Sequence, residues 1–195
     1  MFCKQPCSTC AELRQATLRI VGGEGIEAVT LERLSGEAGL SPDQIAAHYA
    51  SPTACLYATY EEVAQSIHAD FAAAFAAEPS WRRALTAAAR GLLERMAARP
   101  DEAHLCFQEI LRGDHELLRR RDAARRRMVD LFVRELGWRQ GDEQVPRTQL
   151  ELLIGAGFQA IATAVAQDRL AELPQLLAEL TSRAYVFEPA EPAVA

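Results

Sequence analysis

The sequence predicts an all-α protein, and three observations support this prediction. Alanine, leucine, glutamate and arginine dominate the 195 residues, and these residue types have high helix propensity. Runs of β-branched residues, which favour strands, are missing. Apolar residues recur at helical spacing between breaks at glycine and proline. With 49% hydrophobic and 25% charged residues, the chain has the balance of a globular protein that buries a sizeable core.

Three helices are predicted in the N-terminal quarter of the chain. The first runs from about residue 8 to residue 21 and stops at the pair Gly22-Gly23. After a short connection, Thr30 is a good N-cap for a second helix over residues 31–38, because its hydroxyl can accept a hydrogen bond from the first turn. Ser41 is the N-cap of a short third helix over residues 42–48, which has a proline at its first position.

The remaining helices follow from similar start and stop signals. Ser51-Pro52 opens a long helix that reaches about residue 77. Three further helices are separated by Pro79-Ser80, Pro100-Asp101 and Gly113-Asp114, and a polar loop over 137–146 precedes two closing helices over 147–167 and 170–185. Pro174 is tolerated in the last helix only near its first turn. We therefore predict a helix-turn-helix domain over 1–51, a helical domain over 52–187 and a disordered tail over 188–195.

The second and third helices have the lengths of a helix-turn-helix, joined by the turn Gly39-Leu40-Ser41. The alternative is an ordinary helical hairpin, since glycine turns between helices are common. The order of the flanking motifs argues against that alternative. They are Gly-Ile-Glu-Ala-Val-Thr at 25–30, Ala-Gly-Leu-Ser at 38–41, His48-Tyr49, and Ser51 with Leu56. This order closely resembles the DNA-binding domain of the TetR (tetracycline-repressor-like) family.

The resemblance implies a transcriptional regulator, and specifically a repressor that a small-molecule effector releases from DNA. It implies a homodimer whose third helices enter successive major grooves of a palindromic operator. The effector would bind among the C-terminal helices and favour one arrangement of the dimer. Thr30, Ser41, His48 and Tyr49 can each donate a hydrogen bond to phosphate, and Gln44 is the best candidate for reading a base edge.

The sequence departs from the family pattern at three positions that would face DNA. Asp43 replaces the usual small residue at the start of the third helix, Ala46 replaces an aromatic residue, and Pro52 replaces a lysine. No lysine or arginine occurs from Leu34 through Trp81, and the net charge of the chain is −6. Because neutralised phosphates supply most of the salt-dependent affinity, we expect DNA binding to be weak or to depend on unusual contacts.

The closing helices are predicted to form the dimer interface. One apolar stripe comprises Leu150, Ile154, Phe158, Ile161 and Val165, and a second comprises Leu173, Leu176, Leu177, Leu180 and Tyr185. The small residues 155–157 would let another helix approach closely. Packing within one chain explains the same stripes without a dimer.

Aromatic residues, methionines and one histidine at helical spacing are the candidates for contact with the effector, although such residues more often form core. They are Phe71, Phe75, Met96, His104, Phe107, Met128 and Phe158. The arginine-rich segment 119–127 is the only strongly basic one. It is either a solvated helix paired to neighbouring carboxylates or a docking patch for an acidic partner or nucleic acid.

Three N-terminal cysteines, Cys3, Cys7 and Cys10, have the spacing of an iron–sulfur triad, but that chemistry belongs to a strand-rich barrel that this sequence does not predict. A thiolate site for zinc or copper, or a redox switch, is the alternative to unligated thiols. A closed zinc site would take its fourth ligand from a second chain or a histidine. The expectation is nevertheless that the protein has no metal and no cofactor.

Other classes of protein are disfavoured. The sequence shows no Ser-His-Asp arrangement, phosphate-cradling loop or His-Glu metal motif, so we do not expect an enzyme. Its N-terminus lacks the order of a signal peptide, and its apolar runs are interrupted, so we expect a cytoplasmic protein with no membrane partner. Three hypotheses remain: a ligand-responsive DNA-binding regulator, a helical dimer of the same fold without operator affinity, and a thiol-based metal or redox sensor.

Overall fold

The computed structural model describes residues 7–139 and 147–176, and the elements within these residues are all helices, without a strand. The elements are α1 (Ser8–Glu24), η1 (Ile26–Ala28), α2 (Leu31–Ala38), α3 (Pro42–Ala46), α4 (Pro52–Ala77), α5 (Trp81–Ala98), α6 (Pro100–Ala103), η2 (His104–Gln108), η3 (Glu109–Arg112), α7 (His115–Arg139), α8 (Arg147–Ala166) and η4 (Leu170–Leu176). The predicted all-α class is confirmed.

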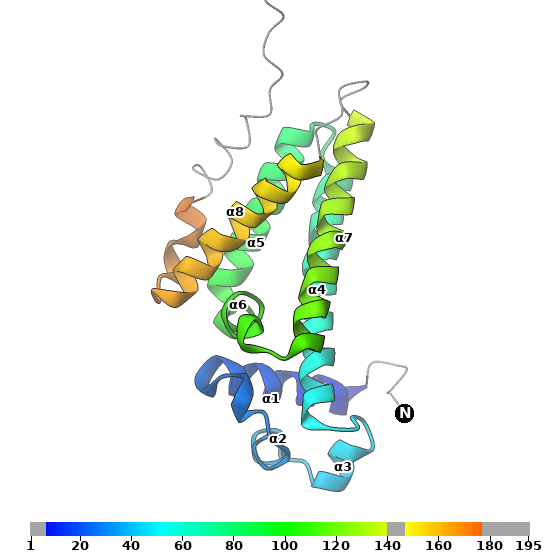
Figure 1. Cartoon of the computed structure of the whole chain (residues 1–195), viewed down its shortest axis with the longest axis vertical. Helices are drawn as coiled ribbons and strands as arrows, with labels where there is room; N and C mark the ends of the chain where they lie inside the picture. The colour runs from blue at the N-terminus through cyan, green and yellow to red at the C-terminus, as the bar shows by residue number, and fades with distance from the viewer. Residues whose placement is uncertain (1–6, 140–146, 177–195) are drawn as a thin grey trace, which may run out of the picture.

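The helices form a long bundle with a small cap at one end. In Figure 1 the long helices α4 and α7 run along the molecule, with α5 and α8 beside them, while α1 crosses beneath and α2 and α3 lie below it. The helix α4 belongs to both parts, since it packs against α1 at its start and against α5 and α7 further along. One buried apolar cluster therefore runs from the cap into the bundle.

The N-cap residues of α2, α3 and α4 are the ones that the sequence predicts. The hydroxyls of Thr30, Ser41 and Ser51 accept hydrogen bonds from backbone N–H groups three residues later, at 3.2, 3.3 and 3.0 Å. Each bond satisfies one of the amide groups that a helix leaves unpaired in its first turn. Gly39, in the left-handed conformation with φ of 67°, ends α2 as predicted.

Two predicted helix ends are wrong. The helix α1 continues through both glycines to Glu24 and ends at Gly25, whose φ of 85° disfavours any other residue. Gly22 serves close approach instead, because a Cβ at this position would overlap the carboxylate of Asp101 in α6. The helix α3 ends at Ala46 rather than near His48.

The C-terminal segment also departs from the prediction. The last described element is a 3-10 helix that contains Pro174, whereas we expected an α-helix to begin at residue 170. A proline cannot donate the backbone hydrogen bond that a continuing helix needs. The predicted stripe residues 177–185 and the predicted tail lie outside the described residues.

By length and composition alone, the helix α8 is long and apolar enough to cross a membrane. Of its most apolar stretch of 18 residues, 28% is buried within the chain. It packs against α7, η2 and η4 as part of the bundle. Its predicted stripe lies on the inner face, where Leu150, Ile154, Ile161 and Val165 are buried. The stripe that we assigned to a dimer interface therefore packs within the chain.

Candidate functional site

The helix-turn-helix presents three of its predicted DNA contacts to solvent. Thr30, Ser41 and Gln44 are exposed at the starts of α2 and α3. Ser41 and Gln44 form a reciprocal capping box, in which the side-chain carbonyl of Gln44 accepts a hydrogen bond from the Ser41 N–H at 2.8 Å. The carbonyl of Gln44 is thus occupied by its own helix, and its NH₂ group is the part that can contact a base edge.

The other two predicted DNA contacts turn toward the protein. His48 is half-buried, and its Nδ1 lies 3.7 Å from the sulfur of Cys7 and 3.4 Å from that of Cys10. Tyr49 is buried, and burial is the main reason that its pKa lies far above the ordinary value. The side chain of Tyr49 also interacts with those of Cys10 and Arg14 of α1. These two residues therefore tie the end of the third helix to α1.

A cavity of about 120 Å³ lies inside the bundle. Its walls come from α4, α5, α7 and α8 and are apolar throughout. They comprise Phe71, Leu85, Ala89, Leu92, Leu93, Met128, Phe132, Leu153, Ile154, Ala156, Gly157, Phe158 and Ile161. Walls of this composition favour apolar groups, because a polar group placed there would lose its hydrogen bonds to water without gaining new ones.

Two smaller cavities extend this apolar one toward polar side chains. One of about 50 Å³ shares Met128 and Phe158 with the large cavity, and one of about 110 Å³ shares Phe158. Both are lined by Arg121 and Arg125 of α7. Burial raises the pKa of Cys106, which lines both cavities, to about 12, so this thiol stays uncharged. Apolar walls at one end and the side chains of two arginines at the other make the arrangement amphipathic, and one of these arginines, Arg121, also pairs with Asp122 at 3.5 Å.

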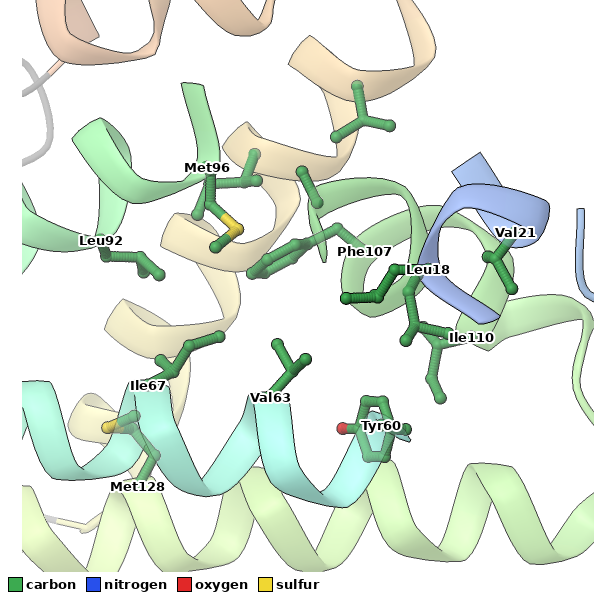
Figure 2. Close-up of a cluster of buried hydrophobic side chains, with 14 of the residues drawn as sticks. Leu18, Val21, Tyr60, Val63, Ile67, Leu92, Met96, Phe107, Ile110 and Met128 are labelled. Carbon is green, nitrogen blue, oxygen red and sulfur yellow. The ribbon is translucent and has the colours of Figure 1, made fainter. Parts of the chain in front are cut away.

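The segment η2–η3 joins these cavities to the helix-turn-helix. Phe107 and Ile110 of this segment line cavities, and Figure 2 shows Phe107 within the buried cluster, with Leu18 and Val21 of α1 on the side of Ile110. Glu109, which lies between Phe107 and Ile110 in the sequence, is buried. Its Oε2 accepts a hydrogen bond from the Ile26 N–H at 3.1 Å. A movement of this segment would therefore also move η1, which directly follows α1.

We expect Glu109→Ala to lower the free energy of unfolding by about 2 kcal/mol, because the Ile26 N–H would lose its charged acceptor. Glu109→Gln, which keeps an acceptor oxygen, should recover part of that loss. Urea denaturation of both variants measures the difference, with Glu27→Ala as the control for an exposed glutamate of the same region. Equal stabilities of Glu109→Ala and the wild type would show that this link carries no energy.

No family model matches the sequence, and no curated protein matches it. The comparison with solved structures does give matches. The fatty acid degradation regulator FadR from Bacillus halodurans superposes with a TM-score of 0.83 at 13% identity, over 92% of this chain and 95% of that one. FadR from Bacillus subtilis, solved in complex with stearoyl-CoA, superposes with a TM-score of 0.79 at 14% identity, over 88% of this chain and 95% of that one.

A TetR-family transcriptional regulator from Streptomyces coelicolor superposes with a TM-score of 0.74 at 20% identity, over 92% of this chain and 89% of that one. The chain has the TetR fold. These identities are low, so they establish the architecture alone, and the cap and bundle of this chain correspond to the helix-turn-helix and helical body of that fold.

Within the TetR fold, four of the seven predicted effector contacts line the cavities: Phe71, Phe107, Met128 and Phe158. Phe75 and Met96 are fully buried core residues, and neither they nor the half-buried His104 line any of these three cavities. The leucines of α5 and the two arginines of α7 were not predicted as pocket residues. The clustered arginines were a visible signal, but helix periodicity could not show which of them line cavities.

Most arginines of the segment 119–127 form ion pairs with carboxylates of this chain. Arg119 and Arg120 form ion pairs with Glu116 of the preceding turn, Arg121 pairs with Asp122 at 3.5 Å, and Arg127 pairs with Glu61 of α4 at 2.9 Å. The hypothesis of a helix paired to neighbouring carboxylates therefore explains much of the segment.

Among the described residues of the helix-turn-helix region, little positive charge is left unpaired. The guanidinium of Arg14 pairs with Glu62 at 2.7 Å, that of Arg19 with Glu37 at 2.5 Å, and that of Arg33 with Glu24. Asp43 is exposed in the first turn of α3, where its negative charge interacts favourably with the positive end of the helix dipole. The same carboxylate would repel a phosphate. The structure thus strengthens the argument that DNA affinity is low.

Proposed function

We propose that this chain is a TetR-type transcriptional regulator that binds operator DNA as a homodimer and is controlled by a long-chain amphipathic anion. The observation that carries the proposal is the set of adjacent cavities with apolar walls at one end and Arg121 and Arg125 at the other. A fatty acyl chain fits the apolar end, and a carboxylate or phosphate head group fits the arginines. The FadR structure with stearoyl-CoA supports this class of ligand by analogy.

The ligand would act by moving the segment η2–η3. Ligand pockets usually exceed about 300 Å³, so a long acyl chain needs more room than the apolar cavity of about 120 Å³ provides. Phe158 lines all three cavities and packs edge-on against Phe107, with 5.4 Å between ring centroids. Opening a passage past Phe158 would displace Phe107, and Glu109 would transmit the displacement to η1. The ligand would thereby favour one placement of the helix-turn-helix over another.

Calorimetric titration of the protein with stearate, stearoyl-CoA and uncharged stearyl alcohol tests the ligand class. Stearate or stearoyl-CoA should bind, and the alcohol should bind at least about tenfold more weakly because it cannot neutralise the arginines. The absence of binding by both charged ligands would contradict the proposal.

The outer face of α8 is the proposed site of dimerisation. Leu152 is 69% exposed on this helix, and the small residue Ala156, one turn later, is exposed as well. An exposed apolar position beside a small residue suits the close packing of a second copy related by two-fold symmetry. Burial against another copy also explains why so apolar a helix is mostly uncovered within one chain.

Leu152→Glu should raise the dissociation constant of the dimer by roughly 100-fold, because two-fold symmetry brings the two new carboxylates into one apolar interface. Sedimentation equilibrium measures the change. Val133→Glu, at an exposed apolar position of α7, is the matched control and should leave the dimer intact. A wild-type protein that is monomeric at every concentration would rule out this interface.

A second function is supported by the charges of the helix-turn-helix. Asp43 and the paired arginines favour a dimer of the same fold that has lost operator affinity and binds a ligand or a protein partner. Either function belongs to a cytoplasmic protein and neither requires catalysis. The two differ in whether the protein distinguishes its own regulatory DNA from random duplex.

A further inference from the structure

Two cysteines and one histidine converge where the third helix meets the first. Cys7 is the N-cap of α1, Cys10 lies one turn later, and His48 follows α3. The two sulfurs and one ring nitrogen all lie within 4.8 Å of one another. Cys10 is buried, whereas Cys7 and His48 are half-buried, so the cluster lies at the edge of the core and can be reached by an ion.

The two sulfur–nitrogen distances match those of a tetrahedral metal site. With Zn–S near 2.3 Å and Zn–N near 2.0 Å, a tetrahedral zinc ion holds sulfur and nitrogen about 3.5 Å apart. Here His48 Nδ1 lies 3.4 Å from the sulfur of Cys10 and 3.7 Å from that of Cys7. A single ring nitrogen has one lone pair or one proton, so it can form one good hydrogen bond in its ring plane. Two sulfurs around the same nitrogen are the arrangement that a shared ion produces.

The surroundings offer hydrogen bonds to the thiolates of a bound metal. The sulfur of Cys7 accepts a hydrogen bond from the Cys10 N–H at 3.3 Å, at the positive end of the helix dipole of α1. The side chain of Tyr49 interacts with those of Cys10 and Arg14, so its hydroxyl is placed to donate to a metal-bound thiolate as an outer hydrogen-bond partner. Sulfur and imidazole ligands select zinc or a similar borderline-soft ion over magnesium or calcium.

We infer that Cys7, Cys10 and His48 bind a zinc ion that fixes the end of the third helix onto the first. The fourth ligand is water or a further side chain. Coordination through Nδ1 leaves the ring proton of His48 on Nε2, the nitrogen that remains able to donate a hydrogen bond to phosphate. The ion would thus hold one predicted DNA contact in a single tautomer and position. This inference does not depend on the proposed ligand or on DNA binding.

The test is metal binding by the full-length protein, treated with a chelator, kept under a non-thiol reductant and titrated with Co²⁺ and then Zn²⁺. We expect one Co²⁺ per chain with thiolate charge-transfer absorption, and its displacement by Zn²⁺. Cys7→Ser and His48→Gln should each weaken binding by more than about 100-fold, beyond the range for outer hydrogen-bond partners, and Tyr49→Phe by about tenfold. Cys55→Ala and His68→Gln, outside the cluster, are matched controls and should bind as the wild type does.

Circular dichroism of each variant separates lost ligation from lost folding. His48 is chosen rather than Cys10 because it is half-buried, so its replacement disturbs the core less than replacement of the buried Cys10 would. Three results would overturn the inference. They are the absence of thiolate–cobalt absorption in the folded wild type, undiminished binding by folded His48→Gln, and a Cys7–Cys10 disulfide that forms in air and is unaffected by Zn²⁺. The last result would identify a redox pair instead.

Discussion

Replacing both Arg121 and Arg125 by glutamine is expected to weaken the binding of stearate or stearoyl-CoA by at least about 100-fold. A charge-assisted hydrogen bond contributes about 1.5–3 kcal/mol, and each arginine would lose one or more of them. Both side chains line the two cavities that extend the apolar one, and neither is needed to line the apolar cavity itself. Binding of the uncharged stearyl alcohol should therefore change little.

Calorimetry on the double variant measures this loss. Arg126→Gln is the matched control, because Arg126 lies on the same helix, is exposed, and lines none of the three cavities. Equal affinity of the double variant and the wild type for stearate would remove the arginines from the ligand site. Equal losses for stearate and stearyl alcohol would indicate a damaged fold rather than a lost head-group contact.

The second large effect is a gain of DNA binding in the triple variant Asp43→Gly, Ala46→Tyr, Pro52→Lys. These changes remove an exposed carboxylate from the first turn of α3, add a hydroxyl that can reach phosphate, and place a positive charge at the start of α4. We expect affinity for duplex DNA to rise at least about tenfold at low salt, and the salt dependence to steepen by roughly 0.9 for the added lysine contact.

Fluorescence anisotropy over a range of salt concentrations measures both quantities. The control variant Glu94→Gln, Ala98→Lys makes the same change in net charge at exposed positions of α5, away from the helix-turn-helix. A gain of the same size in the control would attribute the effect to net charge. No gain in the triple variant would show that Asp43, Ala46 and Pro52 do not limit DNA binding.

The local signals in the sequence predicted most helix starts, because an N-cap is decided by a few neighbouring residues. Thr30, Ser41 and Ser51 each accept the hydrogen bond that their residue type predicts. Helix ends were less predictable where tertiary contacts decide them. Gly22 lies inside α1 because α6 packs closely against it, and that contact joins residues far apart in the chain.

The candidate sites show the same division. Apolar residues such as Phe71 and Phe158 were predicted as pocket residues from their type and spacing, but Met96 and Phe75 have the same signature and are core. The approach of His48 to Cys7 and Cys10 depends on how the third helix folds back on the first. A closed zinc site at the cysteines needs a further ligand, and a histidine is one predicted source, but only the fold identifies which histidine is near.

The central claim is that ligand binding in the bundle controls DNA binding by the helix-turn-helix. Fluorescence anisotropy of the purified protein with duplexes from its own gene neighbourhood, with and without stearoyl-CoA, tests it most directly at low and moderate salt. The account predicts weak, salt-sensitive binding that prefers one neighbourhood duplex over random DNA and that changes on addition of stearoyl-CoA. Binding no better than to random duplex at low salt, or specific binding that no charged acyl ligand alters, would contradict it.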